Sequence, residues 1–294
     1  MTGSFDAYRS KKGYSEKSIR VQDSHIRRYT SWCKNQNIDP EKITYDQALQ
    51  FIDSERARGI LNQSIVREIN SIKIYFDYLQ QNDRVQYNVF SRIRIRQRQV
   101  RVLQYTLSQQ QLEGIYRDYA GLPLWEHRSG NAKRLHVRNV VILGLLVYQG
   151  ITSGELARLE RAHVNLCEGK IYIPMTRKSN ARELTLQAGQ VMVIKEYIED
   201  YLPHYRQYQE NYLFPGKKHS DMVASVIRQV KRIHPEITDA RQLRSSVIMH
   251  WLKTHNIRQV QYMAGHKSIR STEQYRSQDL SNLTRQLELF HPLG

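Results

Sequence analysis

The segment MAGHKSIRSTEQY, residues 263–275, decides how this chain of 294 residues is interpreted. Gly265-His266 precedes Tyr275 by nine residues in it. A tyrosine can attack phosphorus and hold a covalent phosphotyrosine. A histidine can donate a hydrogen bond to a phosphoryl oxygen or help to move a proton. The segment therefore offers Tyr275 and His266 as candidate groups for phosphoryl transfer, with a purely structural role as the alternative in a chain that has 19 tyrosines.

Two further segments and a hairpin complete the pattern. The segment ARQLRSSVIMHWL, residues 240–252, places Arg244 near the start of an apolar helix. A guanidinium group there could make a two-pronged contact with a phosphate. The segment YQGITSGELARL, residues 148–159, carries a glycine and an apolar residue before another helix start. Residues 170–175 and 183–186 look like two strands around a polar turn.

Together, these segments resemble the tyrosine recombinase, or phage integrase, family. The last segment carries the most specific match, because Ile269 and Thr272 complete the family's pattern G-H-x-x-I-x-x-T-x-x-Y. The resemblance covers nearly the whole chain, since the N-terminal residues look like the family's core-binding domain. It implies a site-specific DNA recombinase that cleaves and rejoins strands through a 3′-phosphotyrosine intermediate.

The resemblance also implies roles for single residues. Tyr275 is the expected nucleophile, Arg244 matches the family's second catalytic arginine, and His266 matches its histidine. The family's turn lysine donates a proton to the leaving 5′ oxygen, and Lys178 is the candidate for this role. The adjacent Arg177 could occupy the same slot instead. The chemistry requires no cofactor and no metal.

The chain departs from the family pattern at two catalytic positions. Thr152 follows Gly150-Ile151 and occupies the slot of the family's first arginine, and Arg241 stands where the family has a histidine. Loss of one preorganised donor to a developing oxyanion typically costs about 10²–10³ in rate. Arg241 or an arginine from a neighbouring subunit could supply the missing charge. Alternatively, the chain is a catalytically weakened or inactive DNA-binding accessory protein of the same fold.

Composition favours a nucleic-acid partner. The chain has 45 Lys and Arg residues against 28 Asp and Glu residues, a formal net charge of +17. Such a surplus points to a polyanion, with double-stranded DNA expected.

Two cysteines cannot form a disulfide framework or a cysteine-rich zinc site. The longest apolar run, residues 140–147, is far too short for a membrane span, so we expect a cytoplasmic, nucleoid-associated protein without a membrane partner.

Residues 1–90 predict a helical core-binding domain, and residues 91–102 predict a basic linker. In an extended chain the alternating arginines of the linker would share one face and could follow a phosphate backbone. An exposed edge strand is the alternative. On the preceding helix, Arg67 and Lys73 lie off the apolar stripe and face either DNA or solvent. The DNA-contacting candidates are Arg67, Lys73, Arg92, Arg94, Arg96, Arg98, Arg101 and the hairpin residue Arg177.

Residues 103–294 predict the catalytic domain with a C-terminal tail helix. The expected fold class is mainly α with a small antiparallel β-sheet. Leu280, Leu283 and Leu287 stand at helical spacing in the tail. The resemblance implies that such a tail docks on a neighbouring protomer, giving a tetramer on paired DNA sites. A tail packed on its own domain is the alternative, and DNA-bending proteins are expected as accessory partners.

Two other functions fit the sequence less well. A type IB topoisomerase uses similar tyrosine chemistry, but the separate helical block and the leucine-rich tail favour a recombinase. An RNA-binding protein has only the positive charge in its favour.

Overall fold

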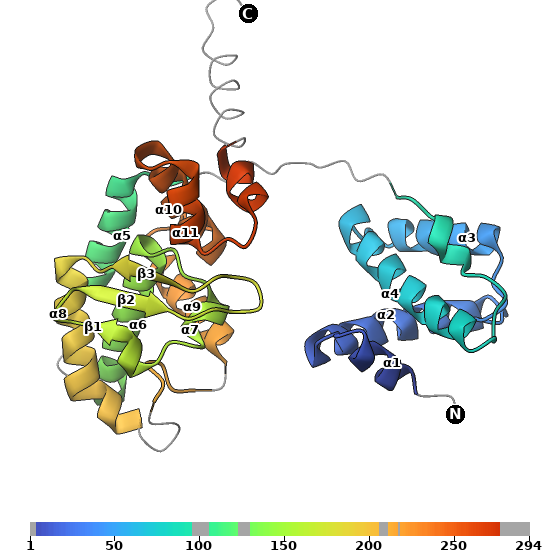
Figure 1. Cartoon of the computed structure of the whole chain (residues 1–294), viewed down its shortest axis with the longest axis horizontal. Helices are drawn as coiled ribbons and strands as arrows, with labels where there is room; N and C mark the ends of the chain where they lie inside the picture. Colours follow the sequence, from blue (N-terminus) through green and yellow to red (C-terminus); the bar gives the residue numbers. More distant parts are fainter. Residues whose placement is uncertain (1–3, 96–105, 123–129, 206–210, 217, 277–294) are drawn as a thin grey trace, which may run out of the picture. The chain divides into compact units, whose positions relative to one another are not determined.

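The computed structural model describes residues 4–95, 106–122, 130–205, 211–216 and 218–276. The chain divides into two compact units, Met1–Arg101 and Val102–Gly294. The described residues of the first unit form helices joined by turns and loops, and the second unit adds a small antiparallel sheet to its helices (Figure 1). The predicted fold class is therefore confirmed.

Helices with polar caps build the first unit. Ser15 and Thr44 directly precede two of them, and each hydroxyl accepts a hydrogen bond from the backbone N–H three residues on, which supplies a partner to a group that the helix itself cannot satisfy. The elements are α1 (Phe5–Lys11), α2 (Glu16–Asn35), α3 (Tyr45–Ala57), α4 (Asn62–Gln81) and the 3-10 turn η1 (Val89–Arg92).

The core of the first unit forms around α4. Its apolar stripe packs against Tyr29 of α2 and Phe51 of α3, whose ring centroids lie 5.5 Å apart. Phe90 and Ile93 are buried in the same core, so the core extends past residue 90 into the predicted linker. Arg92 ends η1 and is not part of an extended run as predicted, because burial of Phe90 draws this segment into a tight turn.

Helices and three short strands follow one another along the described residues of the second unit. They are α5 (Gln109–Ala120), α6 (Gly130–Tyr148), α7 (Ser153–Leu156), η2 (Arg161–His163), β1 (Val164–Asn165), β2 (Lys170–Ile173), β3 (Arg182–Thr185), α8 (Ala188–Glu196), the π-helical η3 (Tyr197–Tyr201), η4 (Leu202–Tyr205), α9 (His219–Val230), α10 (Ala240–Thr254) and α11 (Ile257–Ala264). Residues 269–276 are also helical.

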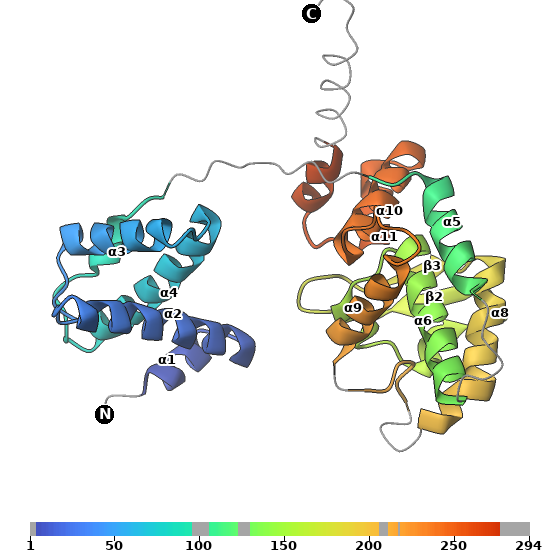
Figure 2. The same ribbon diagram turned by 180° about the vertical axis from the view of Figure 1, so that it is seen from behind.

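Helix α6 is the centre of the second unit. Every residue from 139 to 147 is buried, and α5, α8, α9 and α10 pack around it (Figure 2). An apolar surface on all sides is what a fully enclosed helix requires. The residues that follow α6 therefore leave the middle of the core, and they lead directly to Thr152.

The sheet has the order β1-β2-β3 and is antiparallel throughout. Ile171 and Ile173 of β2 face the core, opposite Leu184 and Arg182 of β3. The predicted hairpin is confirmed. The two-residue strand β1 was not predicted, since so short a segment has no detectable alternation.

Several predicted residues lie outside the described residues. They are Arg96, Arg98, Arg101 and the tail residues Leu280, Leu283 and Leu287. Within the described part of the chain, no helix is both long and apolar enough to cross a bilayer.

The position of α6 predicts unequal effects of two leucine substitutions on one helix. Leu143 is fully buried, so Leu143→Ala should lower the free energy of unfolding by about 2–5 kcal/mol. Leu135 is 43% exposed, and Leu135→Ala should change it by no more than about 0.5 kcal/mol. Urea unfolding of both variants measures the difference. Equal losses would contradict the central position of α6.

Candidate active site

The structure brings three predicted residues together in the second unit. The ring of His266 stacks on that of Tyr275, with centroids 5.8 Å apart and planes 9° from parallel. Tyr275 also interacts electrostatically with the guanidinium group of Arg244. The three residues come from the helix of residues 269–276, the loop after α11 and the first turns of α10. A tyrosine, a cation and an imidazole are thus placed around one point.

Backbone carbonyls hold Arg244 in place. Its guanidinium donates to the carbonyl oxygen of Ala264 at 2.7 Å and to that of Gly150. Gly150 has a φ of +55°, which glycine adopts without strain. The Arg244 side chain is only 14% exposed, and burial lowers its pKa. Arginine nevertheless remains charged in proteins, so Arg244 presents a fixed cation.

His266 is neutral at neutral pH. Burial, together with the positive charges of Arg244 and Arg182, lowers its pKa to about 4. Its Nδ1 atom lies 2.8 Å from the hydroxyl oxygen of Thr272, which is completely buried. The threonine of the sequence pattern therefore orients the imidazole, and Nε2 is the ring nitrogen left for a substrate oxygen.

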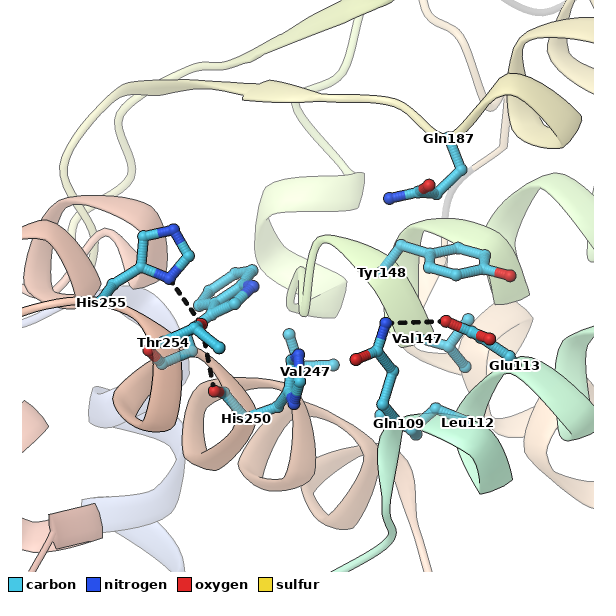
Figure 3. A pocket seen from close by; sticks show the side chains of 11 residues that line it. Gln109, Leu112, Glu113, Val147, Tyr148, Gln187, Val247, His250, Thr254 and His255 are labelled. Atoms are coloured by element: carbon cyan, nitrogen blue, oxygen red, sulfur yellow. Dashed lines mark hydrogen bonds between the residues drawn. The ribbon is translucent and has the colours of Figure 1, made fainter.

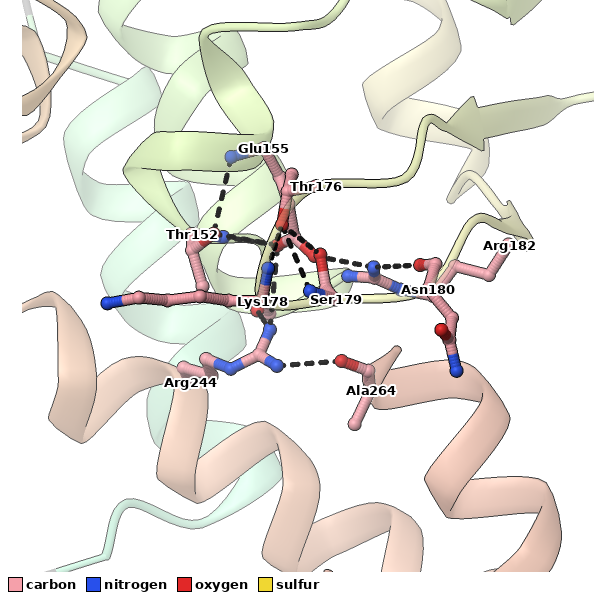
Figure 4. A network of polar contacts seen from close by, with 10 residues as sticks. Thr152, Glu155, Thr176, Lys178, Ser179, Asn180, Arg182, Arg244 and Ala264 are labelled. Carbon is pink, nitrogen blue, oxygen red and sulfur yellow. Dashed lines mark hydrogen bonds and ion pairs between the residues drawn. The ribbon is translucent and has the colours of Figure 1, made fainter. Parts of the chain in front are cut away.

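Thr152 is a helix cap rather than a cation. Its side chain begins α7, and its backbone N–H and hydroxyl donate to Oε2 of Glu155 at 2.8 and 2.9 Å (Figure 4). The position predicted as the first-arginine slot thus supplies two hydrogen bonds to a buried carboxylate. It supplies no positive charge to a phosphate.

The prediction of site residues missed a buried ion pair. Arg182 of β3 donates from Nη1 to Oε1 of Glu155 at 2.6 Å, and both side chains are 0% exposed. Burial alone would raise the pKa of Glu155, but the hydrogen bond and charge of Arg182, with the charge of Arg244, lower it to about 2. The alternation of β3 gave a signal, because it puts Arg182 on the same face as Leu184.

The hairpin turn lies against the Gly-His loop. Asn180 donates from its backbone to the carbonyl of Gly265 at 2.9 Å, and Ser179 forms an isolated β-bridge with His266. Lys178 and Arg177 are both exposed on this turn. In Figure 4 the Lys178 side chain extends from the turn on the side where Thr152 and Arg244 lie. Both candidates for the turn role are therefore near the site.

Arg241 lies at the edge of the site. It is exposed in the first turn of α10, three residues before Arg244. Residues three apart on a helix are neighbours on its surface. Arg241 and Arg244 consequently share one side of α10, and Arg244 is the more buried of the two.

The first unit carries a separate candidate nucleic-acid interface. Arg67, Arg92 and Arg94 are exposed. Lys73 donates to the carbonyl of Ile93 at 3.2 Å, and burial together with the charge of Arg94 lowers its pKa. Lys73 and Arg94 also line one hollow beside α4.

Other cations of the first unit are occupied internally. Arg9 is 1% exposed and pairs with Asp6 and Asp23. Arg28 pairs with the buried Glu68 at 3.2 Å. Positive residues on this unit are therefore not equally available to a polyanion.

A separate pocket of about 200 Å³ opens between α5, α6 and α10 (Figure 3). Gln109, Tyr148, Trp251 and His255 are among the residues that line it, and none of the predicted site residues does. Among the described residues, no group of three or more His, Cys, Asp or Glu side chains could hold a metal ion.

Comparison with known sequences gives a consistent result. The model of the phage integrase family matches residues 124–281. The tyrosine recombinase XerC of Chlorobaculum parvum is 21% identical, with 96% of this chain and 90% of that protein covered. The TnP I resolvase of Bacillus thuringiensis is 23% identical, with 97% and 98% covered.

Comparison with solved structures supports the same fold. The Tn1549 transposon integrase in complex with transposon right end DNA has a TM-score of 0.66 at 13% identity, and 96% of this chain and 97% of that chain are covered. A lambda integrase dimer bound to a COC′ core site has a TM-score of 0.65 at 15% identity, with 92% and 75% covered.

The environment of His266 predicts an unusual titration. NMR on isotope-labelled protein should show a midpoint at about 4, below the ordinary 6.5, and Arg244→Gln should raise it. Because the pKa is lower in the folded state, the unfolded chain binds this proton first as the pH falls below 6.5. Acid should therefore weaken the fold through His266 until the pH falls through the folded pKa. A wild-type midpoint near 6.5 would contradict the described surroundings.

Proposed function

The chain belongs to the phage integrase family, and on that premise we propose that Tyr275 is the nucleophile with which it cleaves and rejoins DNA. Members of this family are site-specific tyrosine recombinases, and this chain is such an enzyme. The observation that carries the residue assignment is the grouping of Tyr275, His266 and Arg244 around one point.

The proposed reaction conserves the phosphodiester bond energy. The hydroxyl oxygen of Tyr275 attacks the scissile phosphorus, a 3′-phosphotyrosine forms, and the 5′ oxygen leaves. Arg244 and His266 donate hydrogen bonds to the phosphoryl oxygens as negative charge develops on them. A 5′ hydroxyl from a partner duplex then attacks the phosphotyrosine, which releases Tyr275 and exchanges the strand.

The leaving 5′ oxygen needs a proton. A lysine ammonium releases a proton far more readily than a guanidinium group does. We therefore assign the general acid to Lys178, and we assign a phosphate contact to Arg177. Their shared place on the turn next to His266 supports both roles.

Because Thr152 stands in the first-arginine slot, the site needs another positive charge at the scissile phosphate. Thr152 binds Glu155 and cannot meet that need. Arg241 is exposed one helical turn before Arg244, which makes it the proposed second guanidinium at the phosphate. A second phosphate-binding group of this kind stabilises the same developing charge.

The proposed DNA interface includes both units. Residues 1–90 act as the core-binding domain, residues 91–102 as a basic strap and residues 103–294 as the catalytic domain. The DNA complexes among the similar structures support double-stranded DNA as the partner. The phosphate contacts we propose are Arg67, Lys73, Arg92, Arg94, Arg96, Arg98, Arg101 and Arg177.

Exchange between two duplexes needs more than one protomer. A homotetramer on two paired sites, joined by the C-terminal tails, satisfies this need, and DNA-bending proteins would assist the pairing. A DNA substrate supports a cytoplasmic, nucleoid-associated protein.

The nucleophile is tested with DNA nicked close to the cleavage point, from which a short fragment escapes and traps the adduct. The wild type should form a covalent protein–DNA species on a denaturing gel, and Tyr275→Phe should form none. Tyr172→Phe is the matched control, because Tyr172 lies on β2 and is 43% exposed. Strong binding by the wild type without any adduct on a true site would instead favour the non-catalytic accessory protein.

The assignment of the general acid predicts a chemical rescue. Lys178→Ala should lose about 10²–10⁴ in cleavage rate on ordinary DNA. A substrate with sulfur in place of the 5′-bridging oxygen needs no proton on its leaving group, so it should restore most of that loss. Arg177→Ala should be slowed equally on both substrates. Rescue of Arg177→Ala alone would reverse the two assignments.

Phosphate contacts predict a change in salt dependence. Arg67→Ala should reduce the slope of log affinity against log salt concentration by about 0.9, the value for one lost phosphate contact on duplex DNA. Arg56→Ala is the control, since Arg56 of α3 pairs with Asp53 at 2.8 Å. Fluorescence anisotropy over a salt series measures both slopes, and identical slopes would remove Arg67 from the interface.

A further inference from the structure

Arg182 lies where three site segments meet. Its Nη1 atom donates to Oε1 of Glu155 at 2.6 Å and lies 3.5 Å from the carbonyl oxygen of Asn180 in the hairpin turn. A Cβ atom at Gly265 would overlap the Arg182 guanidinium and come within 3.0 Å of its central carbon. One buried cation thus contacts the start of α7, the turn and the Gly-His loop (Figure 4).

Not all hydrogen-bond donors of the Arg182 guanidinium group have partners among the described residues. The Nε and Nη2 atoms of Arg182 are buried and have no hydrogen-bond partner among the described residues. An unpaired buried donor costs free energy, and most native structures avoid it. A side chain chosen only to fill this volume would be apolar, so the charge itself requires an explanation.

Glu155 supplies that explanation, because it lies between two guanidinium groups. Arg182 is hydrogen bonded to Oε1, whereas Arg244 is 3.8 Å from Oε2, beyond hydrogen-bond distance. The backbone N–H and hydroxyl of Thr152 donate to Oε2. Both carboxylate oxygens therefore have partners without Arg244, whose guanidinium donates to neutral carbonyls instead.

We propose that Arg182 is a positioning residue that binds Glu155 and thereby keeps the charge of Arg244 available for the scissile phosphate. This inference rests on the proposed function. The charges of Arg182, Glu155 and Arg244 sum to +1. Without Arg182 they sum to zero, and the carboxylate would turn to the nearest remaining cation, Arg244. In a chain with Thr152 in the first-arginine slot, that loss would remove the main positive charge at the phosphate.

Four variants test the proposal. Arg182→Met removes the charge, and Arg182→Lys keeps it. The double variant Arg182→Met with Glu155→Gln removes both charges of the pair and leaves Arg244 unopposed. Lys170→Met is the control, because Lys170 belongs to the same sheet and its ion-pair partners among the described residues are the exposed Glu168 and Glu183. Thermal melting of each variant sets a temperature at which all are folded.

The first readout is single-turnover cleavage of nicked DNA by the folded variants. Arg182→Met should lose about 10²-fold in cleavage rate, the scale of one lost oxyanion donor, with DNA affinity unchanged. Arg182→Lys and the double variant should each recover at least a tenth of the wild-type rate, and Lys170→Met should match the wild type. Wild-type cleavage by folded Arg182→Met, or a double variant as slow as the single one, would overturn the proposal.

The second readout does not depend on cleavage. Arg244, Arg182 and Glu155 are the charged groups that face His266, beside Tyr275 and Thr272. The pKa of His266 in the free protein should rise in Arg182→Met and return toward the wild-type value in the double variant. If the wild type forms no adduct, the proposed function fails, while this titration still decides the inference. An unchanged titration in Arg182→Met would overturn it.

Discussion

The buried ion pair between Arg182 and Glu155 is the interaction on which the second unit's functional end depends. It joins β3 to the start of α7, and the close approach of Arg182 to Gly265 adds the loop after α11. Removal of one partner from such a pair typically costs about 3–5 kcal/mol, because the other charge is left buried and alone. The same pair therefore fixes the fold locally and sets the distances between segments that carry the chemistry.

Around that pair, the site is organised by fixed neutral groups. The carbonyls of Gly150 and Ala264 orient Arg244, and the hydroxyl of Thr272 orients His266. Such groups need no rearrangement as charge develops on a phosphate, which is the condition for effective electrostatic stabilisation. The threonine in the first-arginine slot fits this arrangement, since its hydroxyl binds the carboxylate that would otherwise compete for Arg244.

The local part of this organisation was predictable from sequence, and the part that depends on tertiary contacts was not. The spacing in residues 263–275 predicts that His266 and Tyr275 lie close together, and their rings do stack, because both residues belong to one short segment of the chain. Sequence alternation placed Arg182 on an inward face, but only the folded contact with Glu155, 27 residues away, reveals its partner. The extended conformation expected at Arg92 is wrong for the same reason, because burial of Phe90 favours a tight turn over the local extended pattern.

The two described hydrophobic cores have no residue in common, since one lies between Tyr29 and Ile93 and the other between Leu107 and Ala264. In folding terms, each unit can be its own cooperative domain, with its own free energy of unfolding. A single melting temperature is then not a property of the whole chain. Core substitutions in different units are expected to have additive effects on stability, so a change in the core of the first unit need not lower the stability of the unit that holds Tyr275.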